Sequence, residues 1–237
     1  MTSRPTRFVR GALSGLFFLV YGLFALPFAV ILPFLPKRWG RWAVRFFYRL
    51  FVIAARMTGV YRVVFAEGSR EALAALRGRI VVMNHVSLID ICVLLSFIPD
   101  AVCIAKAAAK RNPFLSAVVR RLFIANDRGP EETVTEVRGY LSRGVNVVVF
   151  PQGTRGGGKL HRGAARLALA SGTEIAAVRI DYDPVILAKG QPWWDIGDRI
   201  ITIRLAFRGM LTPEGEDSHR NAVALTERIA ALIGRSR

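Results

Sequence analysis

A stretch of 25 residues without a charged side chain, Gly11–Leu35, constrains this chain more than any other feature of its sequence. A helix needs about 20 apolar residues to cross the hydrocarbon core of a bilayer, so this stretch is long enough to span. It is too long for the ~7–15-residue apolar region of a cleaved signal peptide, and no small-residue cleavage site follows it. Two alternatives stay open: a single transmembrane helix, or a re-entrant hairpin broken near Pro27 and Pro33, because proline kinks a helix.

The charge balance points to an anionic partner. The chain has 34 Lys and Arg against 17 Asp and Glu, a formal net charge of +17, yet 52% of its residues are hydrophobic. Such a composition excludes a disordered basic tail, which requires low hydrophobicity. A nucleic-acid binder would account for the charge but would leave Gly11–Leu35 unexplained. We therefore expect an anionic membrane surface as the partner, and no nucleic acid.

The next stretch, Arg38–Arg62, has the periodicity of an amphipathic helix. Arg41, Arg45 and Arg49 recur every four residues, which places them along one helical face, with Trp and Phe residues between them. This pattern predicts a helix in the lipid headgroup layer, with the arginines reaching phosphate groups; the alternative is a solvated helix face packed on a core. We expect residues 1–58 to form a membrane-anchoring segment and residues 59–237 to form a separate folded domain.

From about Val60 onward, apolar segments of strand length alternate with segments of helical period. This alternation predicts an α/β fold with a largely buried central sheet, mixed and mostly parallel, flanked by helices. The expected strands are Ile80–Met83, Ala101–Ala105, Val145–Phe150, Glu174–Ile180 and Ile200–Phe207, and Phe123–Ala125 is a short apolar stretch. The expected helices are Leu88–Phe97, Phe114–Leu122, Glu131–Ser142, Gly163–Ser171 and Ser218–Ile233.

A histidine and an aspartate follow the first of these strands. His85 comes directly after the strand Ile80–Met83, and Asp90 stands five positions further on. A carboxylate that accepts a hydrogen bond from one ring nitrogen leaves the other nitrogen free to take a proton. On the spacing alone, a structural histidine beside an ordinary helix acid is the favoured interpretation.

A glycine-rich loop follows the clearest strand. The sequence FPQGTR at residues 150–155 leaves Val145–Phe150, and three glycines and Lys159 come next. Backbone N–H groups together with Arg155 and Lys159 can form a cradle for an anion. The loop does not match a nucleotide-binding P-loop, and the chain has no G-x-S-x-G elbow for a serine hydrolase. Its two isolated cysteines and three scattered histidines predict no metal site.

Together the two stretches resemble the membrane-associated glycerolipid acyltransferases, the family that contains 1-acylglycerol-3-phosphate acyltransferase. Asn84, His85 and Asp90 match its signature N-H-x-x-x-x-D, and residues 150–155 match its block F-P-E-G-T-R. The two blocks lie about 65 residues apart, as the family requires. The resemblance covers roughly Val60–Arg208.

The resemblance implies an acyltransferase that needs no cofactor, because its donor, an acyl thioester of coenzyme A or of acyl carrier protein, already carries an activated acyl group. It implies that His85 is the general base that deprotonates a glycerol hydroxyl and that Asp90 orients it. The implied acceptor is a lysophospholipid, most simply 1-acylglycerol-3-phosphate giving phosphatidic acid, or else another lysolipid. The implied location is the cytoplasmic face of the inner membrane.

The resemblance also assigns substrate-binding residues. Gly153, Thr154 and Arg155 would hold the acceptor's phosphate with Arg128 as a helper, and Asn84 would donate a hydrogen bond near the reacting carbonyl.

The chain departs from the family pattern at two of these places. Gln152 stands where the family usually has Glu, so that a role in substrate binding could survive but a role that needs charge could not. Asn126 and Asp127 precede Arg128, which adds one residue to the family's middle block. Gln152 also motivates the rival hypothesis of a non-catalytic lipid-binding protein that keeps the fold.

Overall fold

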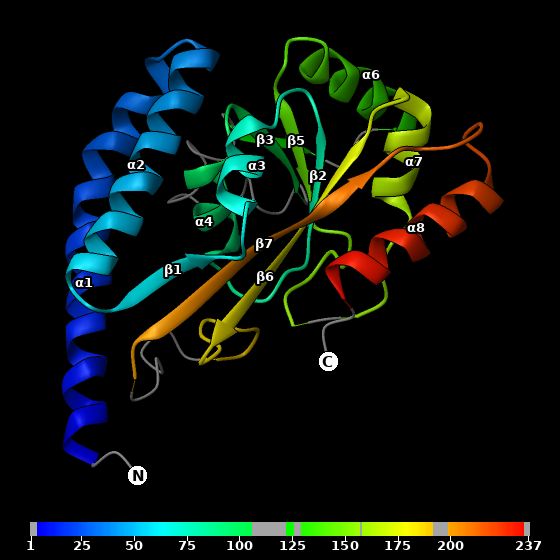
Figure 1. The fold of residues 1–237 in the computed structure, drawn as a ribbon. Coiled ribbons are helices and arrows are strands. Elements are labelled where there is room, and N and C mark those ends of the chain that lie inside the picture. The colour runs from blue at the N-terminus through cyan, green and yellow to red at the C-terminus, as the bar shows by residue number, and fades with distance from the viewer. Residues whose placement is uncertain (1–3, 106–121, 126–128, 157, 192–198, 235–237) are drawn as a thin grey trace.

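The computed structural model describes residues 4–105, 122–125, 129–156, 158–191 and 199–234 (Figure 1). Among these residues, seven strands form one sheet in the order β1-β7-β6-β2-β5-β3-β4. Neighbouring strands pair in parallel, except that β6 and β7 are antiparallel. The predicted mixed, mostly parallel sheet is therefore confirmed. The strands are β1 Tyr61–Phe65, β2 Ile80–Met83, β3 Ala101–Ala105, β4 Phe123–Ala125, β5 Asn146–Val149, β6 Ile175–Asp183 and β7 Ile201–Leu211.

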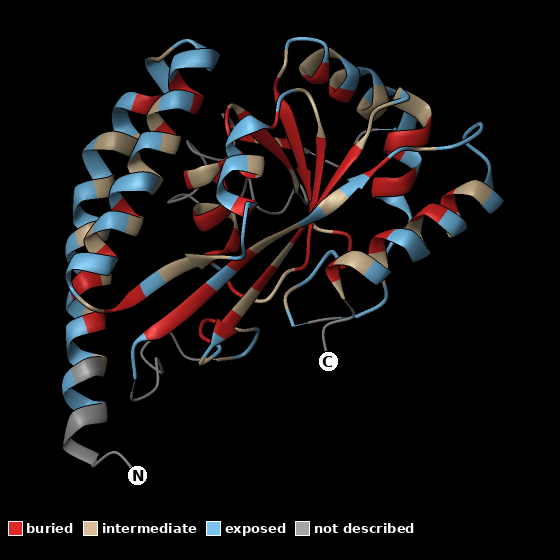
Figure 2. Ribbon diagram, viewed as in Figure 1, coloured by how far each residue is buried: buried red, intermediate tan, exposed pale blue. Residues whose placement is uncertain are grey.

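Helices cover both faces of the sheet. One face packs against α2, α3 and α4, and the other packs against α6, α7 and α8. The central strands are apolar on both sides for this reason: in β2, Val81 and Met83 face the first layer, and Ile80 and Val82 face the second. Figure 2 shows the central strands β2 and β5 as continuously buried. The helices are α1 Arg4–Ile31, α2 Lys37–Met57, α3 Ser69–Ala75, α4 Asp90–Phe97, α6 Pro130–Leu141, α7 Gly163–Ser171 and α8 His219–Ile233, with the short 3-10 helix η1 at Leu32–Phe34.

Most of the expected elements are present, with shifts of one or two residues at their ends. The largest differences are at β6, which continues past Ile180 to Asp183, and at β7, which continues past Phe207 to Leu211, because these two strands pair with each other along this length. Strand β1 and helix α3 were not predicted, and β4 forms at the short apolar stretch Phe123–Ala125. The expected helix Phe114–Leu122 lies outside the described residues, apart from Leu122.

The N-terminal apolar stretch forms the first arm of a helical hairpin. Helix α1 continues through Pro27, and the chain turns at η1, so α2 is the second arm. Aromatic rings join the two arms: Phe17 and Tyr21 contact Phe51, and Phe28 stacks on Phe47. The pairs run in opposite directions along the two helices, which lie side by side in Figure 1. By length and composition, Gly11–Phe34 could cross a membrane.

Two arginines of α2, Arg41 and Arg49, bond the folded domain, which differs from the headgroup role that their spacing suggested. Arg41 is buried and forms two hydrogen bonds to the carboxylate of Asp100, at 2.6 and 2.7 Å. Arg49 donates from Nε to the carbonyl of Ser96 at 2.8 Å, near the C-terminal end of α4, where a cation is favourable. The four-residue period grouped these side chains correctly, but it does not say which face of the helix is buried.

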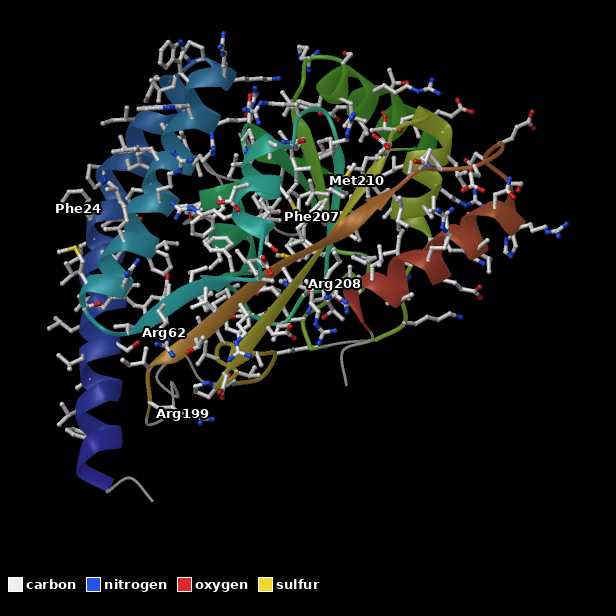
Figure 3. All side chains as sticks on the ribbon, viewed as in Figure 1. Phe24, Arg62, Arg199, Phe207, Arg208 and Met210 are labelled. Atoms are coloured by element: carbon white, nitrogen blue, oxygen red, sulfur yellow. The ribbon has the colours of Figure 1, made fainter. Side chains whose placement is uncertain are left out.

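The face of α2 opposite its buried residues Val44, Phe51 and Ala55 is apolar and exposed, and it continues the exposed apolar surface of α1 (Figure 2). On α1, Phe24 points away from the sheet (Figure 3). The hairpin therefore presents hydrocarbon to its surroundings on its outer side, as a helix at a lipid surface does. The exposed residues of α2 on this side are Trp39, Trp42, Phe46, Leu50, Ile53 and Met57.

Two neighbouring residues of α2 test this orientation. We expect Arg41→Ala to cost about 2 kcal/mol of stability, because it removes charged hydrogen bonds, and to lower Tm by about 4–8 °C without changing vesicle binding. Trp42→Glu should leave Tm in detergent unchanged and reduce co-sedimentation with phosphatidylcholine/phosphatidylglycerol vesicles. The opposite pattern, with Arg41→Ala losing vesicle binding at an unchanged Tm, would restore the headgroup role of the arginine stripe.

Candidate active site

The carboxylate of Asp90 is the centre of the site. Asp90 begins α4, and its side chain has 0% exposed surface. Its Oδ2 accepts hydrogen bonds from Nδ1 of His85 at 2.8 Å and from the backbone N–H groups of Val86 and Ser87 at 2.7 and 2.9 Å. Its Oδ1 accepts a fourth from the hydroxyl of Tyr182 at 2.7 Å. These donors offset the cost of removing a carboxylate from water.

This arrangement fixes which ring nitrogen of His85 is available. Since Asp90 acts as an acceptor, Nδ1 carries the proton and Nε2 has a free lone pair. Within the described residues Nε2 has no hydrogen-bond partner, and the side chain is 21% exposed. The ring also stacks on Phe150, with centroids 4.4 Å apart. An oriented imidazole with one open nitrogen can act as a general base.

The second sequence block holds the backbone of His85. Oε1 of Gln152 accepts a hydrogen bond from the N–H of His85 at 2.7 Å, and the N–H of Gly156 donates to the carbonyl of His85 at 3.1 Å. Gln152 is only 2% exposed. Its predicted role in substrate binding stays a prediction, and in the structure its side chain also holds the histidine loop.

Asn84 connects two strands at the edge of the site. Its side-chain amide donates to the carbonyl of Ile180 and accepts from the N–H of Ile180, both at 2.8 Å. The amide is buried, and it joins the end of β2 to β6. The hydrogen bond from Asn84 to a reacting carbonyl stays a prediction.

The glycine-rich loop begins with a tight turn. The N–H of Gly153 donates to the carbonyl of Phe150 at 3.0 Å, and Gly153 has a φ of +64°, a conformation that favours glycine. Gly153 and Thr154 are exposed, so both can reach a ligand. The ring of His161 lies beside Gly153, 3.5 Å from the position a Cβ there would take.

Arg155 connects three loops through hydrogen bonds. Its NH1 donates to the carbonyl of Leu187 at 2.9 Å, and the N–H of Leu88 donates to the same carbonyl at 3.2 Å. The loop after β2, the glycine-rich loop and the loop after β6 thus meet at one oxygen. A guanidinium has five N–H donors, so Arg155 keeps donors for an anion. Arg128 lies outside the described residues, as do Asn126 and Asp127.

Sequence reasoning missed Tyr182. It lies on β6, beyond the predicted end of that strand, and it is buried in the core beside Asp90. Burial and the charge of Asp90 raise the pKa of Tyr182 well above its ordinary value, so the hydroxyl stays a protonated donor. The alternation of Ile180 and Tyr182 on one face of a longer strand was the available signal.

Comparisons with known proteins agree with this geometry. A family model described as Acyltransferase matches residues 61–181, which is 121 of the 237 residues. The lyso-ornithine lipid O-acyltransferase of Rhizobium meliloti (strain 1021) is 30% identical over 155 residues, covering 63% of this chain and 50% of that protein. The chain therefore spans about half the length of this curated relative.

A solved structure matches nearly the whole chain. The crystal structure of the 1-acyl-sn-glycerophosphate (LPA) acyltransferase PlsC from Thermotoga maritima superposes with a TM-score of 0.67, at 26% identity, over 94% of both chains. The fold, the paired histidine and aspartate, and the family match over half of the sequence lead to one conclusion: the chain belongs to the acyltransferase family.

Proposed function

We propose that this protein transfers an acyl group from an acyl thioester, carried on coenzyme A or acyl carrier protein, to the free hydroxyl of a lysophospholipid. The simplest acceptor is 1-acylglycerol-3-phosphate, which would give phosphatidic acid. The observation that carries the proposal is the 2.8 Å contact between Nδ1 of His85 and Oδ2 of Asp90, in a side chain whose Nε2 has no partner among the described residues. The same intact pair argues against a non-catalytic lipid-binding protein.

The chemistry follows from that open nitrogen. Nε2 of His85 takes the proton of the acceptor hydroxyl as the hydroxyl oxygen attacks the thioester carbonyl. The C–S bond of the resulting tetrahedral intermediate then breaks, an ester forms, and the departing thiolate takes the proton back from the imidazolium. Asp90 keeps the imidazole oriented throughout and stabilises its charged form. No enzyme nucleophile and no cofactor are required, because the thioester supplies the activated acyl group.

The glycine-rich loop is the proposed phosphate site. Gly153 and Thr154 are exposed beside the histidine loop, and Arg155 brings a permanent positive charge to them. A planar guanidinium suits a phosphate because it can bind two oxygens at once. We propose that Gln152 and Asn84 hold the backbone around this site in position, through His85 and Ile180 respectively.

A second acceptor class has a specific observation behind it. The matched Rhizobium meliloti protein is named for a lyso-ornithine lipid, whereas the matched Thermotoga maritima protein is named for a glycerophosphate. Acylation of another lysolipid by the same His85 is therefore the alternative proposal. The two differ in whether the acceptor's phosphate contributes to binding.

We further propose that the hairpin lies on one leaflet, at the cytoplasmic face of the inner membrane. Helix α2 runs beside α1 and is docked on the domain through Arg41 and Arg49. If α1 crossed the bilayer, the basic helix α2 would have to enter the hydrocarbon with it, at a high cost for each charge. Seated in the surface instead, the hairpin places its exposed apolar side in lipid and its basic charge near anionic headgroups.

Replacement of the proposed base gives the first kinetic test. We expect His85→Ala to lower kcat by about 10²–10⁴-fold, because the proton of the acceptor hydroxyl loses its base. Acyl transfer is measured with detergent-solubilised protein, labelled acyl thioester and a panel of lysolipids. His219→Ala, which changes an exposed histidine at the start of α8, should retain wild-type kcat. Retained activity in His85→Ala would overturn the assignment of the base.

Gln152 is tested by a matched pair of variants. Gln152→Ala should lower kcat by about tenfold or more, since the buried N–H of His85 loses its acceptor. Gln152→Glu should retain most of the activity, because its carboxylate still offers an acceptor oxygen at the same place. Equal losses in both variants would show that charge or shape at residue 152, and not the hydrogen bond, is what the site requires.

Arg155→Ala separates the two acceptor classes. For an acceptor recognised through its phosphate, KM should rise by about tenfold or more with a smaller change in kcat, because the lost interaction is with the bound substrate. For a phosphate-free lysolipid, KM should change little. Arg70→Ala, on the exposed side of α3, serves as the control for removing a surface arginine. An unchanged KM for 1-acylglycerol-3-phosphate would exclude Arg155 from the phosphate site.

A further inference from the structure

We propose that Tyr182 is a positioning residue of the acyl-transfer site, which fixes the rotation of the Asp90 carboxylate and, through Asp90, the direction in which Nε2 of His85 points. The inference rests on the proposed function of the His85–Asp90 pair. It adds a residue from outside both sequence blocks to the machinery of that pair.

The two oxygens of Asp90 have different partners. All three donors to Oδ2 come from the loop at residues 85–87, which immediately precedes α4. Among the described residues, Tyr182 is the donor to Oδ1, and it comes from β6 in the sheet. A carboxylate held along one edge only by its own loop can move together with that loop. The bond from Tyr182 anchors the other oxygen to the most rigid part of the molecule.

Tyr182 is itself firmly placed. It pairs in register with Ile203 of β7, and its ring packs in the core. The phenol is thus one of four donors that surround the carboxylate, together with Nδ1 of His85 and the backbone N–H groups of Val86 and Ser87. Deleting its oxygen leaves Oδ1 buried without a donor, which is costly in an apolar surrounding.

The chain contains a matched control for this deletion. Tyr61 of β1 is buried in the same hydrophobic cluster as Tyr182, and its strand also pairs with β7. Its hydroxyl is buried and has no hydrogen-bond partner among the described residues. Tyr61→Phe and Tyr182→Phe each remove one oxygen from this core, but Asp90 loses a donor only in Tyr182→Phe.

Steady-state kinetics of the full-length protein in detergent test the proposal. Both variants are assayed well below their melting temperatures, so that any loss of stability does not enter the rates. We expect Tyr182→Phe to lower kcat by about tenfold with KM for both substrates within about twofold of wild type, and Tyr61→Phe to match wild type. In an Asp90→Asn background, Tyr182→Phe should have no further effect on kcat, because its action passes through Asp90. Equal losses in the two tyrosine variants, or additive effects with Asp90→Asn, would overturn the proposal.

A measurement that does not depend on turnover accompanies the kinetics. The chain has three histidines, so the ¹⁵N spectrum of histidine-labelled protein can be assigned by comparison with His85→Ala. We expect wild type and Tyr61→Phe to hold His85 as the single Nδ1–H tautomer, and Tyr182→Phe to show a mixture of tautomers. An unchanged His85 spectrum in Tyr182→Phe would contradict the positioning role. If wild type acylates no lysolipid, the proposed function fails, and this spectrum alone decides the role of Tyr182.

Discussion

The carboxylate of Asp90, which has no exposed surface, determines the conformation of the loop that surrounds it. A buried carboxylate is stable only when several donors surround it, and here two backbone N–H groups, an imidazole and a phenol converge on its two oxygens. The loop at residues 85–87 must fold so that its N–H groups point inward at Asp90. That folding brings His85 into contact with the carboxylate and leaves its second ring nitrogen open. The position of the proposed base is thus a consequence of satisfying one buried charge.

The second sequence block acts on the same loop from the other side. Gln152 and Gly156 bond the N–H and the carbonyl of His85, so the peptide groups on both sides of the histidine are held. The contact of Gln152 is an ordinary hydrogen bond to a neutral N–H, which needs an acceptor oxygen but no charge. Substitution of Gln for the family's usual Glu therefore keeps this contact. With Gln at residue 152, Asp90 is the carboxylate that contacts His85 among the described residues, and the side chain at residue 152 adds no second negative charge there.

Local patterns in the sequence predicted what depends on neighbours along the chain. The strand Ile80–Met83 was found because it is apolar on both faces, and His85 and Asp90 were found because, with Asn84, they match a short family signature that follows this strand. Tyr182 was missed because Asp181 and Asp183 flank it, so the segment has the polarity of a turn; it is a strand only because β7 pairs with it. Arg41 was grouped correctly with the other arginines of α2, but its contact with the domain was not predicted, since its partner Asp100 lies 59 residues away along the chain. Contacts between distant segments are the part that periodicity cannot supply.

One short helix links the hairpin to the proposed catalytic pair. Helix α4 has eight residues, about 12 Å of helix, with Asp90 at its first position and Ser96 near its last. Arg49 of the hairpin bonds the carbonyl of Ser96, and Arg41 bonds Asp100 just beyond the helix. The hairpin also shares one continuous hydrophobic cluster with α4 and the sheet, so it is not a loosely tethered anchor. If the hairpin inserts into lipid, the depth of its insertion therefore determines the distance of His85 from the membrane surface. An enzyme whose acceptor stays in the bilayer would require this rigid connection.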